Sequence, residues 1–139
     1  MRWKEENRLV PFCPEVAGGL PTPRDPAEIT HGADASDVLD GQANILTCAG
    51  ENVTPAFLQG ARLAVEKARH EGCCHAILTD RSPSCGSLQI YDGLFRGQTK
   101  QGAGVTATLL ARAGLTIWNE NQIDALASEL TRLEKEMAR

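Results

Sequence analysis

The amino-acid sequence predicts an α/β fold in which helices pack on the faces of a mostly parallel sheet. In the second half of the chain, apolar runs of strand length alternate with amphipathic segments of helix length. The strands are expected at 75–79 and 115–118, and the helices at 105–113 and from residue 121 onward. Parallel neighbours require crossover connections of this length, so the alternation favours a parallel sheet. The chain of 139 residues has the size of one domain, and we expect residues 1–139 to form a single one.

The first half of the chain is expected to be less regular. Residues 2–7 have the polar pattern of the last turns of a helix, and residues 9–12 contain a short apolar strand. The stretch 13–29 holds four of the seven prolines and a glycine pair, which predicts an ordered loop. Residues 38–39 and 43–48 are expected to form short strands or a hairpin.

A long helix is expected to begin at Thr54 and to end at Gly72. The Thr54 hydroxyl suits a capping role, and Pro55 suits the first helical position because its missing N–H would have no partner there. Apolar residues recur at helical spacing through this segment: Phe57, Leu58, Ala61, Val65 and Ala68. Asn121 is expected to cap the final helix.

Composition and charge restrict the class of partner. The 14 Lys and Arg residues face 18 Asp and Glu, and the net charge of −4 offers no basic face for duplex nucleic acid. Aromatic residues make up only 4% of the chain, too few for a platform that stacks single-stranded bases. No apolar run approaches the roughly 20 residues of a membrane helix, and residues 1–8 lack the apolar stretch of a signal peptide. We therefore expect a cytoplasmic protein, away from membranes, whose partners are small molecules or proteins.

Two of the five cysteines lie in loops that suit chemistry. Cys13 opens a loop rich in proline and glycine, and Cys85 lies between Ser84 and Gly86 in a second loop. Both loops are expected to leave the carboxyl ends of parallel strands, where ligands bind in such sheets. A cysteine in a rigid loop can hold a metal as a thiolate, or it can be a buried small hydrophobe. The cytosol keeps thiols reduced, so a disulfide framework is not expected.

Four separated segments carry a family resemblance. They are, in chain order, CPEVAGGLPTPRDPAEI, NVTPAFLQGA, RSPSCGSLQIYDG and GAGVTATLLARAG. From about Leu9 to Trp118 the chain closely resembles the family known as domain of unknown function 523, which includes the thiouracil desulfidases. The resemblance implies a Rossmann-like, three-layer α/β domain. It also implies a 4Fe-4S cluster held by only three cysteines, with one iron open to take sulfur from a thiolated pyrimidine in a non-redox reaction.

The resemblance also assigns roles to individual residues. Cys13 and Cys85 match two of the cluster cysteines, and Glu15 matches the acidic group beside the cluster. Ser84 or Ser82 matches the neighbouring hydroxyl group. The resemblance thus implies that Glu15 is the general acid or base. It implies that Ser84 forms a hydrogen bond with a cluster sulfur or with the substrate carbonyl, and that Ser82 contacts the substrate.

The first cluster ligand of the family has no match in this chain. In the family it lies in a Ser-x-Cys-Leu-Leu-Gly motif after an N-terminal strand, which we expect to be missing here. Either the chain starts downstream of the biological start, or it is a shortened homologue. Cys48 is the remaining candidate for a substitute ligand, although a buried strand cysteine is the preferred interpretation. Cys73 and Cys74 are interpreted as structural.

Four further features have two interpretations each. Arg24, which is held in place by Pro21 and Pro23 before it, binds a nucleotide phosphate or forms a surface ion pair. The segment 91–93 closes a pocket or only forms a turn. Residues 102–104 receive an anion at a helix N-terminus or simply begin the helix, and the latter is preferred. The three histidines lack the spacing of metal ligands and are expected to be solvated or packed.

The leading hypothesis from the sequence is an iron–sulfur desulfidase that removes sulfur from thiouracil or a thiouridine nucleotide. A second hypothesis makes Cys85 a metal-free nucleophile with a lowered pKa. A third is a non-catalytic carrier of a cluster or of sulfur, or an inactive truncated homologue.

Overall fold

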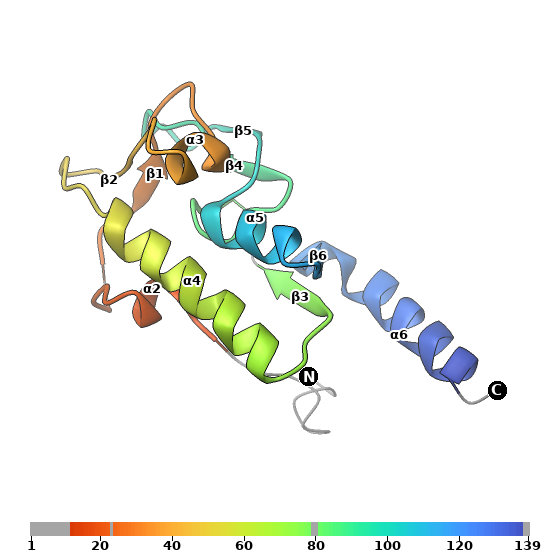
Figure 1. Cartoon of the computed structure of the whole chain (residues 1–139). Helices are drawn as coiled ribbons and strands as arrows, with labels where there is room; N and C mark the ends of the chain where they lie inside the picture. The colour runs from red at the N-terminus through yellow and green to blue at the C-terminus, as the bar shows by residue number, and fades with distance from the viewer. Residues whose placement is uncertain (1–11, 23, 79–80, 138–139) are drawn as a thin grey trace.

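The computed structural model describes residues 12–22, 24–78 and 81–137 (Figure 1). The elements in chain order are α2 (Pro14–Ala17), β1 (Ala27–Ile29), α3 (Ala35–Leu39), β2 (Ile45–Thr47), α4 (Thr54–His70), β3 (His75–Leu78), β4 (Gln89–Tyr91), β5 (Thr99–Gln101), α5 (Val105–Arg112), β6 (Thr116–Asn119), the 3-10 turn η1 (Glu120–Gln122) and α6 (Ile123–Met137). The helix expected at 2–7 and most of the strand expected at 9–12 lie outside the described residues.

The predicted α/β class is confirmed. Strands β3 and β6 pair in parallel, with His75 opposite Thr116 and Leu78 opposite Asn119. The connection between them contains α5, which packs against α4 (Figure 1), as a parallel crossover requires. The other two strand pairs that the structure describes, β1 with β2 and β4 with β5, are antiparallel.

The helices and strands expected in the second half are confirmed, with small shifts at their ends. The helix expected from Thr54 is α4, but its N-cap is Val53. Thr54 instead accepts a hydrogen bond from the backbone N–H of Ile45 at 2.8 Å, so its hydroxyl ties α4 to β2. The cap before α6 is also displaced: the Asn119 side chain accepts from the N–H of Asn121.

Two predictions for the first half are wrong. Residues 38–39 belong to helix α3 and not to a strand, because Asp34 and Asp37 form a reciprocal capping box that starts the helix. The stretch 13–29 contains the regular elements α2 and β1 as well as loop. The strand expected at 43–48 is confirmed as β2, but it pairs with β1 and so forms no hairpin with 38–39.

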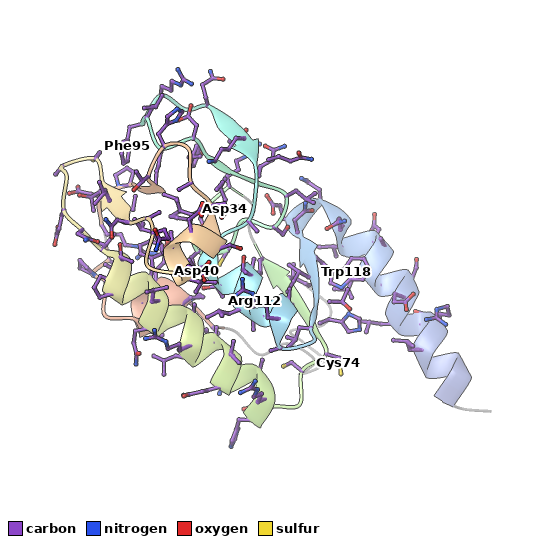
Figure 2. The ribbon with its side chains drawn as sticks, turned by 45° about the horizontal axis from the view of Figure 1, so that its top comes forward. Asp34, Asp40, Cys74, Phe95, Arg112 and Trp118 are labelled. Atoms are coloured by element: carbon purple, nitrogen blue, oxygen red, sulfur yellow. The ribbon has the colours of Figure 1, made fainter. Side chains whose placement is uncertain are left out.

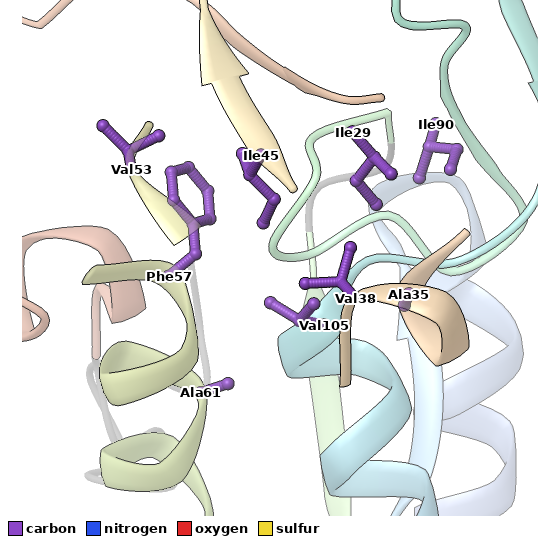
Figure 3. Packing of buried hydrophobic residues seen from close by; sticks show 9 residues of the cluster. All are labelled: Ile29, Ala35, Val38, Ile45, Val53, Phe57, Ala61, Ile90 and Val105. Atoms are coloured by element: carbon purple, nitrogen blue, oxygen red, sulfur yellow. The ribbon is translucent and has the colours of Figure 1, made fainter. Parts of the chain in front are cut away.

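The main hydrophobic core joins β1, β2, α3, α4 and the start of α5 (Figure 3). Its buried residues are Ile29, Ala35, Val38, Ile45, Val53, Phe57, Ala61, Ile90 and Val105. A smaller cluster of Ala64, Ala68 and Leu110 lies between α4, α5 and the parallel pair. Helix α4 contributes residues to both clusters and therefore connects the main core with the smaller cluster.

Helix α6 extends away from this body and contacts chiefly β6 and η1 (Figure 1). None of the helices within the described ranges combines the length and the apolar character needed to cross a lipid bilayer.

Candidate functional site

The loop that contains Cys85 is fixed by the N-terminus of α5. The first N–H groups of a helix have no partner inside the helix, and here the loop carbonyls accept from them. Pro83 O accepts from Val105 N at 2.8 Å, and Ser84 O accepts from Thr106 N at 2.8 Å. Gly104 N also donates to Gly86 O at 2.7 Å. The helix start is thus occupied by the Cys85 loop, and the interpretation of 102–104 as an anion site is wrong.

The two serines of this loop hold Cys85 in place. Ser82 Oγ accepts from the backbone N–H of Cys85 at 2.7 Å. Ser84 is fully buried, and its Oγ lies 2.7 Å from the Thr106 hydroxyl. The Cys85 thiol donates to Ser84 Oγ over 3.7 Å. Ser84 therefore contacts the sulfur atom directly, whereas Ser82 orders the backbone.

Cys13 is placed by the short helix α2. It occupies the N-cap position, with Pro14 as the first helical residue and Glu15 in the first turn. Helix α2 lies against α4 with almost no space between the backbones: a Cβ added to Gly60 would lie 1.9 Å from Pro14 O. The close approach at Gly60 therefore fixes the position of Cys13, whose side chain is exposed.

The two cysteine loops meet in space. Burial raises the pKa of the Cys85 thiol, and the nearby Glu15 and Cys13 side chains raise it further. The hydroxyl groups of the two loop serines lower it. Residues separated by about 70 positions in the chain thus share one electrostatic environment, which agrees with the expectation that both loops share one rim. A free nucleophilic cysteine needs a lowered pKa, so these surroundings do not favour the metal-free hypothesis.

Arg24 forms an ion pair with Glu15. Its Nε donates to Glu15 Oε2 at 3.1 Å, and one terminal nitrogen donates to the same oxygen. The hydrogen bond to Glu15 raises the pKa of Arg24. Its other terminal nitrogen donates to Pro21 O at 3.2 Å and to the Thr22 hydroxyl at 3.3 Å. Of the two interpretations of Arg24, the ion pair is confirmed, and phosphate binding stays a prediction.

A cavity of about 800 Å³ opens beside these loops, within the range of roughly 300–1,000 Å³ of small-molecule sites. Glu15 and Arg24 line one side, and Ser82 and Pro83 of the Cys85 loop line another. Tyr91 lies in the lining, so part of the segment 91–93 does border a pocket. The neighbours of both cysteines therefore face a space that admits a small molecule.

Sequence reasoning missed a buried carboxylate in the wall of this cavity. Glu28 lies on β1, lines the cavity, and is only 7% exposed. Its Oε1 accepts from the backbone N–H groups of Gly93 at 2.9 Å and Phe95 at 3.2 Å. The one signal in the sequence is an isolated carboxylate between two apolar residues, Ala27 and Ile29.

The remaining three cysteines lie outside the two loops. Cys73 packs against the smaller core cluster, and Cys74 is exposed at the start of β3, far from the turn at Phe95 (Figure 2). Cys48 is exposed at the end of β2, so the expectation of a buried strand cysteine is wrong. Its backbone N–H donates to Pro26 O at 3.0 Å, and Pro26 belongs to the cavity lining.

Two of the histidines are occupied by other contacts. His31 Nδ1 lies 2.9 Å from Asp92 O, and His75 Nδ1 accepts from the indole N–H of Trp118 at 3.1 Å. His70 is exposed beside Glu71. All three are packed or solvated, as expected.

The donor chemistry of the two loops fits part of an iron–sulfur site. Cysteine thiolates are the usual ligands of such clusters, and binding to a metal deprotonates a thiol whose pKa is raised. In the ranges that the structure describes, no group of three or more His, Cys, Asp or Glu side chains is arranged to hold a metal ion. The two loops thus supply two thiolates, and a complete cluster needs a further ligand.

Comparisons with known proteins agree with this geometry. The sequence pattern of the 2-thiouracil desulfurase family matches residues 1–122. The uncharacterized protein YbbK of Bacillus subtilis (strain 168) is 44% identical over 120 residues, which cover 86% of this chain and 79% of YbbK. The structure also matches that of the [4Fe-4S]-dependent thiouracil desulfidase TudS, a protein of the domain of unknown function 523 family. The TM-score is 0.82 and the identity 42%, over 94% of this chain and 79% of TudS. The shared fold confirms the α/β architecture expected from the four segments.

Proposed function

The chain belongs to the 2-thiouracil desulfurase family, and from this premise we propose that it removes sulfur from a thiolated pyrimidine with the help of a 4Fe-4S cluster. One observation carries the proposal: Cys13, Cys85 and Glu15 share one electrostatic environment, and Glu15 lines a cavity of about 800 Å³ together with Ser82 and Pro83 of the Cys85 loop. TudS, which has the same fold, is a [4Fe-4S]-dependent thiouracil desulfidase.

Cys13 and Cys85 are the cluster ligands in this proposal, and a third comes from outside the two loops. When bound, such a cluster supplies an open iron that acts as a Lewis acid with an affinity for sulfur. Cys48, a partner chain or a small thiol are the candidates for the third ligand. The backbone N–H of Cys85 donates a hydrogen bond to Ser82 Oγ, and Ser84 contacts the sulfur atom. Together these contacts hold one thiolate in a fixed orientation.

Glu15 is the proton carrier. The overall reaction exchanges a C=S group for C=O: water adds its oxygen to the carbon, the C–S bond breaks, and hydrogen sulfide leaves, with no net oxidation. Both protons of the water must end on sulfur, and a carboxylate at the cavity edge can carry them one after the other. The ion pair with Arg24 holds the carboxylate in one orientation and leaves its Oε1 without a donor among the described residues.

The test is the conversion of 2-thiouracil to uracil and sulfide by protein reconstituted with iron and sulfide without oxygen. We expect the wild type and Cys74→Ala to be active, because Cys74 lies at the far end of β3. Glu15→Gln should lose at least about 100-fold in rate, since general acid–base catalysis contributes roughly 10²–10⁴-fold. Cys85→Ala should lose the activity because it removes a cluster ligand.

Three results would contradict the proposal. A cluster-loaded protein that leaves 2-thiouracil unchanged would overturn the substrate class. An activity that survives iron chelation and is lost on alkylation of Cys85 would favour the metal-free cysteine enzyme. Cluster binding without turnover of any thiolated pyrimidine would favour a carrier or an inactive homologue.

A further inference from the structure

Glu28 differs from the other carboxylates that line the cavity. Asp25 and Glu51 are exposed to solvent, and Glu15 is half-buried and paired with Arg24. Glu28 is 7% exposed. Removing a carboxylate from water is costly unless hydrogen bonds or a counter-ion compensate. Such a group in a cavity wall therefore requires an explanation.

The described residues donate hydrogen bonds to only one of the two carboxylate oxygens of Glu28. Oε1 accepts both hydrogen bonds, from the N–H groups of Gly93 and Phe95. Within residues 12–22, 24–78 and 81–137, no basic side chain forms an ion pair with Glu28, and no group donates to Oε2. The small exposed part of Glu28 belongs to the cavity lining. One carboxylate oxygen thus anchors a turn, and the second has no donor among the described residues and belongs to a residue of the cavity wall.

We propose that Glu28 determines specificity by accepting, through Oε2, a hydrogen bond from a ring N–H of the substrate. This rests on the proposed function, because thiolated pyrimidines carry an N–H next to the thiocarbonyl carbon. A buried acceptor increases the affinity for a ligand that donates a hydrogen bond to it. It lowers the affinity for a ligand that does not, because the acceptor then stays unpaired. The two hydrogen bonds at Oε1 hold the carboxylate still, so that the ligand meets an oxygen already in place.

The same contacts allow a competing explanation, in which Glu28 only positions the 93–95 turn. Gly93 packs tightly here: a Cβ at this position would lie 2.4 Å from His31 N. Glu28→Gln separates the two explanations. Its side-chain oxygen can still accept from Gly93 and Phe95, while its NH₂ group replaces the acceptor Oε2 with a donor. The Glu28→Gln variant therefore loses the proposed substrate contact but keeps the hydrogen bonds that position the turn.

The experiment measures equilibrium binding of uracil and of 1,3-dimethyluracil to the cluster-reconstituted protein by calorimetry. Uracil has the ring N–H groups but no sulfur, so binding is independent of desulfidation. In Glu28→Gln we expect the Kd for uracil to rise at least about tenfold, a change of roughly 1.4 kcal/mol. The weaker binding of 1,3-dimethyluracil should not change. Glu66→Gln, which removes one charge from the exposed face of α4, should bind both ligands as the wild type does.

The outcomes distinguish this proposal from the desulfidase proposal. Unchanged uracil binding in Glu28→Gln, equal weakening for both ligands, or no uracil binding to the wild type would each overturn the role of Glu28, even if 2-thiouracil is desulfidated. The expected pattern without any desulfidation would support N–H recognition and overturn the reaction instead. An unchanged unfolding midpoint of Glu28→Gln confirms that the turn is intact.

Discussion

Gly104 lies directly against Ser84: a Cβ on Gly104 would lie 2.4 Å from the Ser84 carbonyl carbon and 2.5 Å from its oxygen. Real Cβ atoms do not approach backbone this closely. The absence of a side chain at the start of α5 is therefore what allows the carbonyl groups of the Cys85 loop to accept hydrogen bonds from the N–H groups of that helix.

Gly104→Ala should displace the Cys85 loop. Overpacking of this kind costs about 1–3 kcal/mol, and we expect that loss in the free energy of unfolding measured by chemical denaturation. Gly102→Ala is the matched control, since its Cβ would meet only side-chain atoms of Ile90, at 3.1 and 3.2 Å. The control should change stability by less than about 1 kcal/mol. Equal effects of the two substitutions would show that the contact with Ser84 is unimportant.

Gly60→Ala should separate α2 from α4. Alanine normally stabilises a helix by about 1 kcal/mol relative to glycine, but here the new Cβ would lie 1.9 Å from Pro14 O. We expect a net loss of stability and faster hydrogen exchange of the α2 amides. Gln59→Ala, at an exposed position of the same helix, should be nearly neutral. A stabilised Gly60→Ala protein would refute the close packing of α2.

Ser84 and Thr106 should be energetically coupled through their buried hydroxyl groups. Each of Ser84→Ala and Thr106→Val leaves the other hydroxyl without this partner, at a cost of about 1–3 kcal/mol. The double variant removes both groups, so its loss should be smaller than the sum of the single losses by about 0.5–3 kcal/mol. Strict additivity in the denaturation curves would argue against the hydrogen bond.

Asp92 should make the stability depend on acid pH. The hydrogen bond from the N–H of Leu94 lowers the pKa of Asp92, and the Arg96 guanidinium lowers it further. A carboxylate with a lowered pKa stabilises the folded state above its unfolded pKa, and this contribution is lost as the pH falls through the folded value. The stability difference between the wild type and Asp92→Asn should therefore shrink below about pH 4. A difference that stays constant on acidification would contradict this.

The sequence predicted correctly that the two cysteine loops lie close together, but it predicted the helices and strands of the first half of the chain less well. The positions of Cys13 and Cys85 in loops that follow strands were predicted from the pattern of strands and loops, and the four family segments added Glu15 and the role of cluster ligand. The apolar pair Val38 and Leu39 favours a strand, whereas the capping pair of Asp34 and Asp37 indicates the start of helix α3.

Glu28 could not be identified in the same way. Its hydrogen-bond partners Gly93 and Phe95 are 65 and 67 positions away in the chain, and only the tertiary structure brings that turn to β1. The Phe95 backbone adopts a φ of 54°, which is uncommon for a residue with a side chain. No local pattern predicts either feature.

The most direct measurement is the content of iron and acid-labile sulfide per chain after reconstitution without oxygen. We predict that the wild type and Cys74→Ala hold about four iron atoms per chain, as one 4Fe-4S cluster requires, and that Cys13→Ala and Cys85→Ala each lose most of it. Folded wild-type protein without iron, or full iron content in both the Cys13→Ala and Cys85→Ala proteins, would contradict the assignment of these two thiols as cluster ligands.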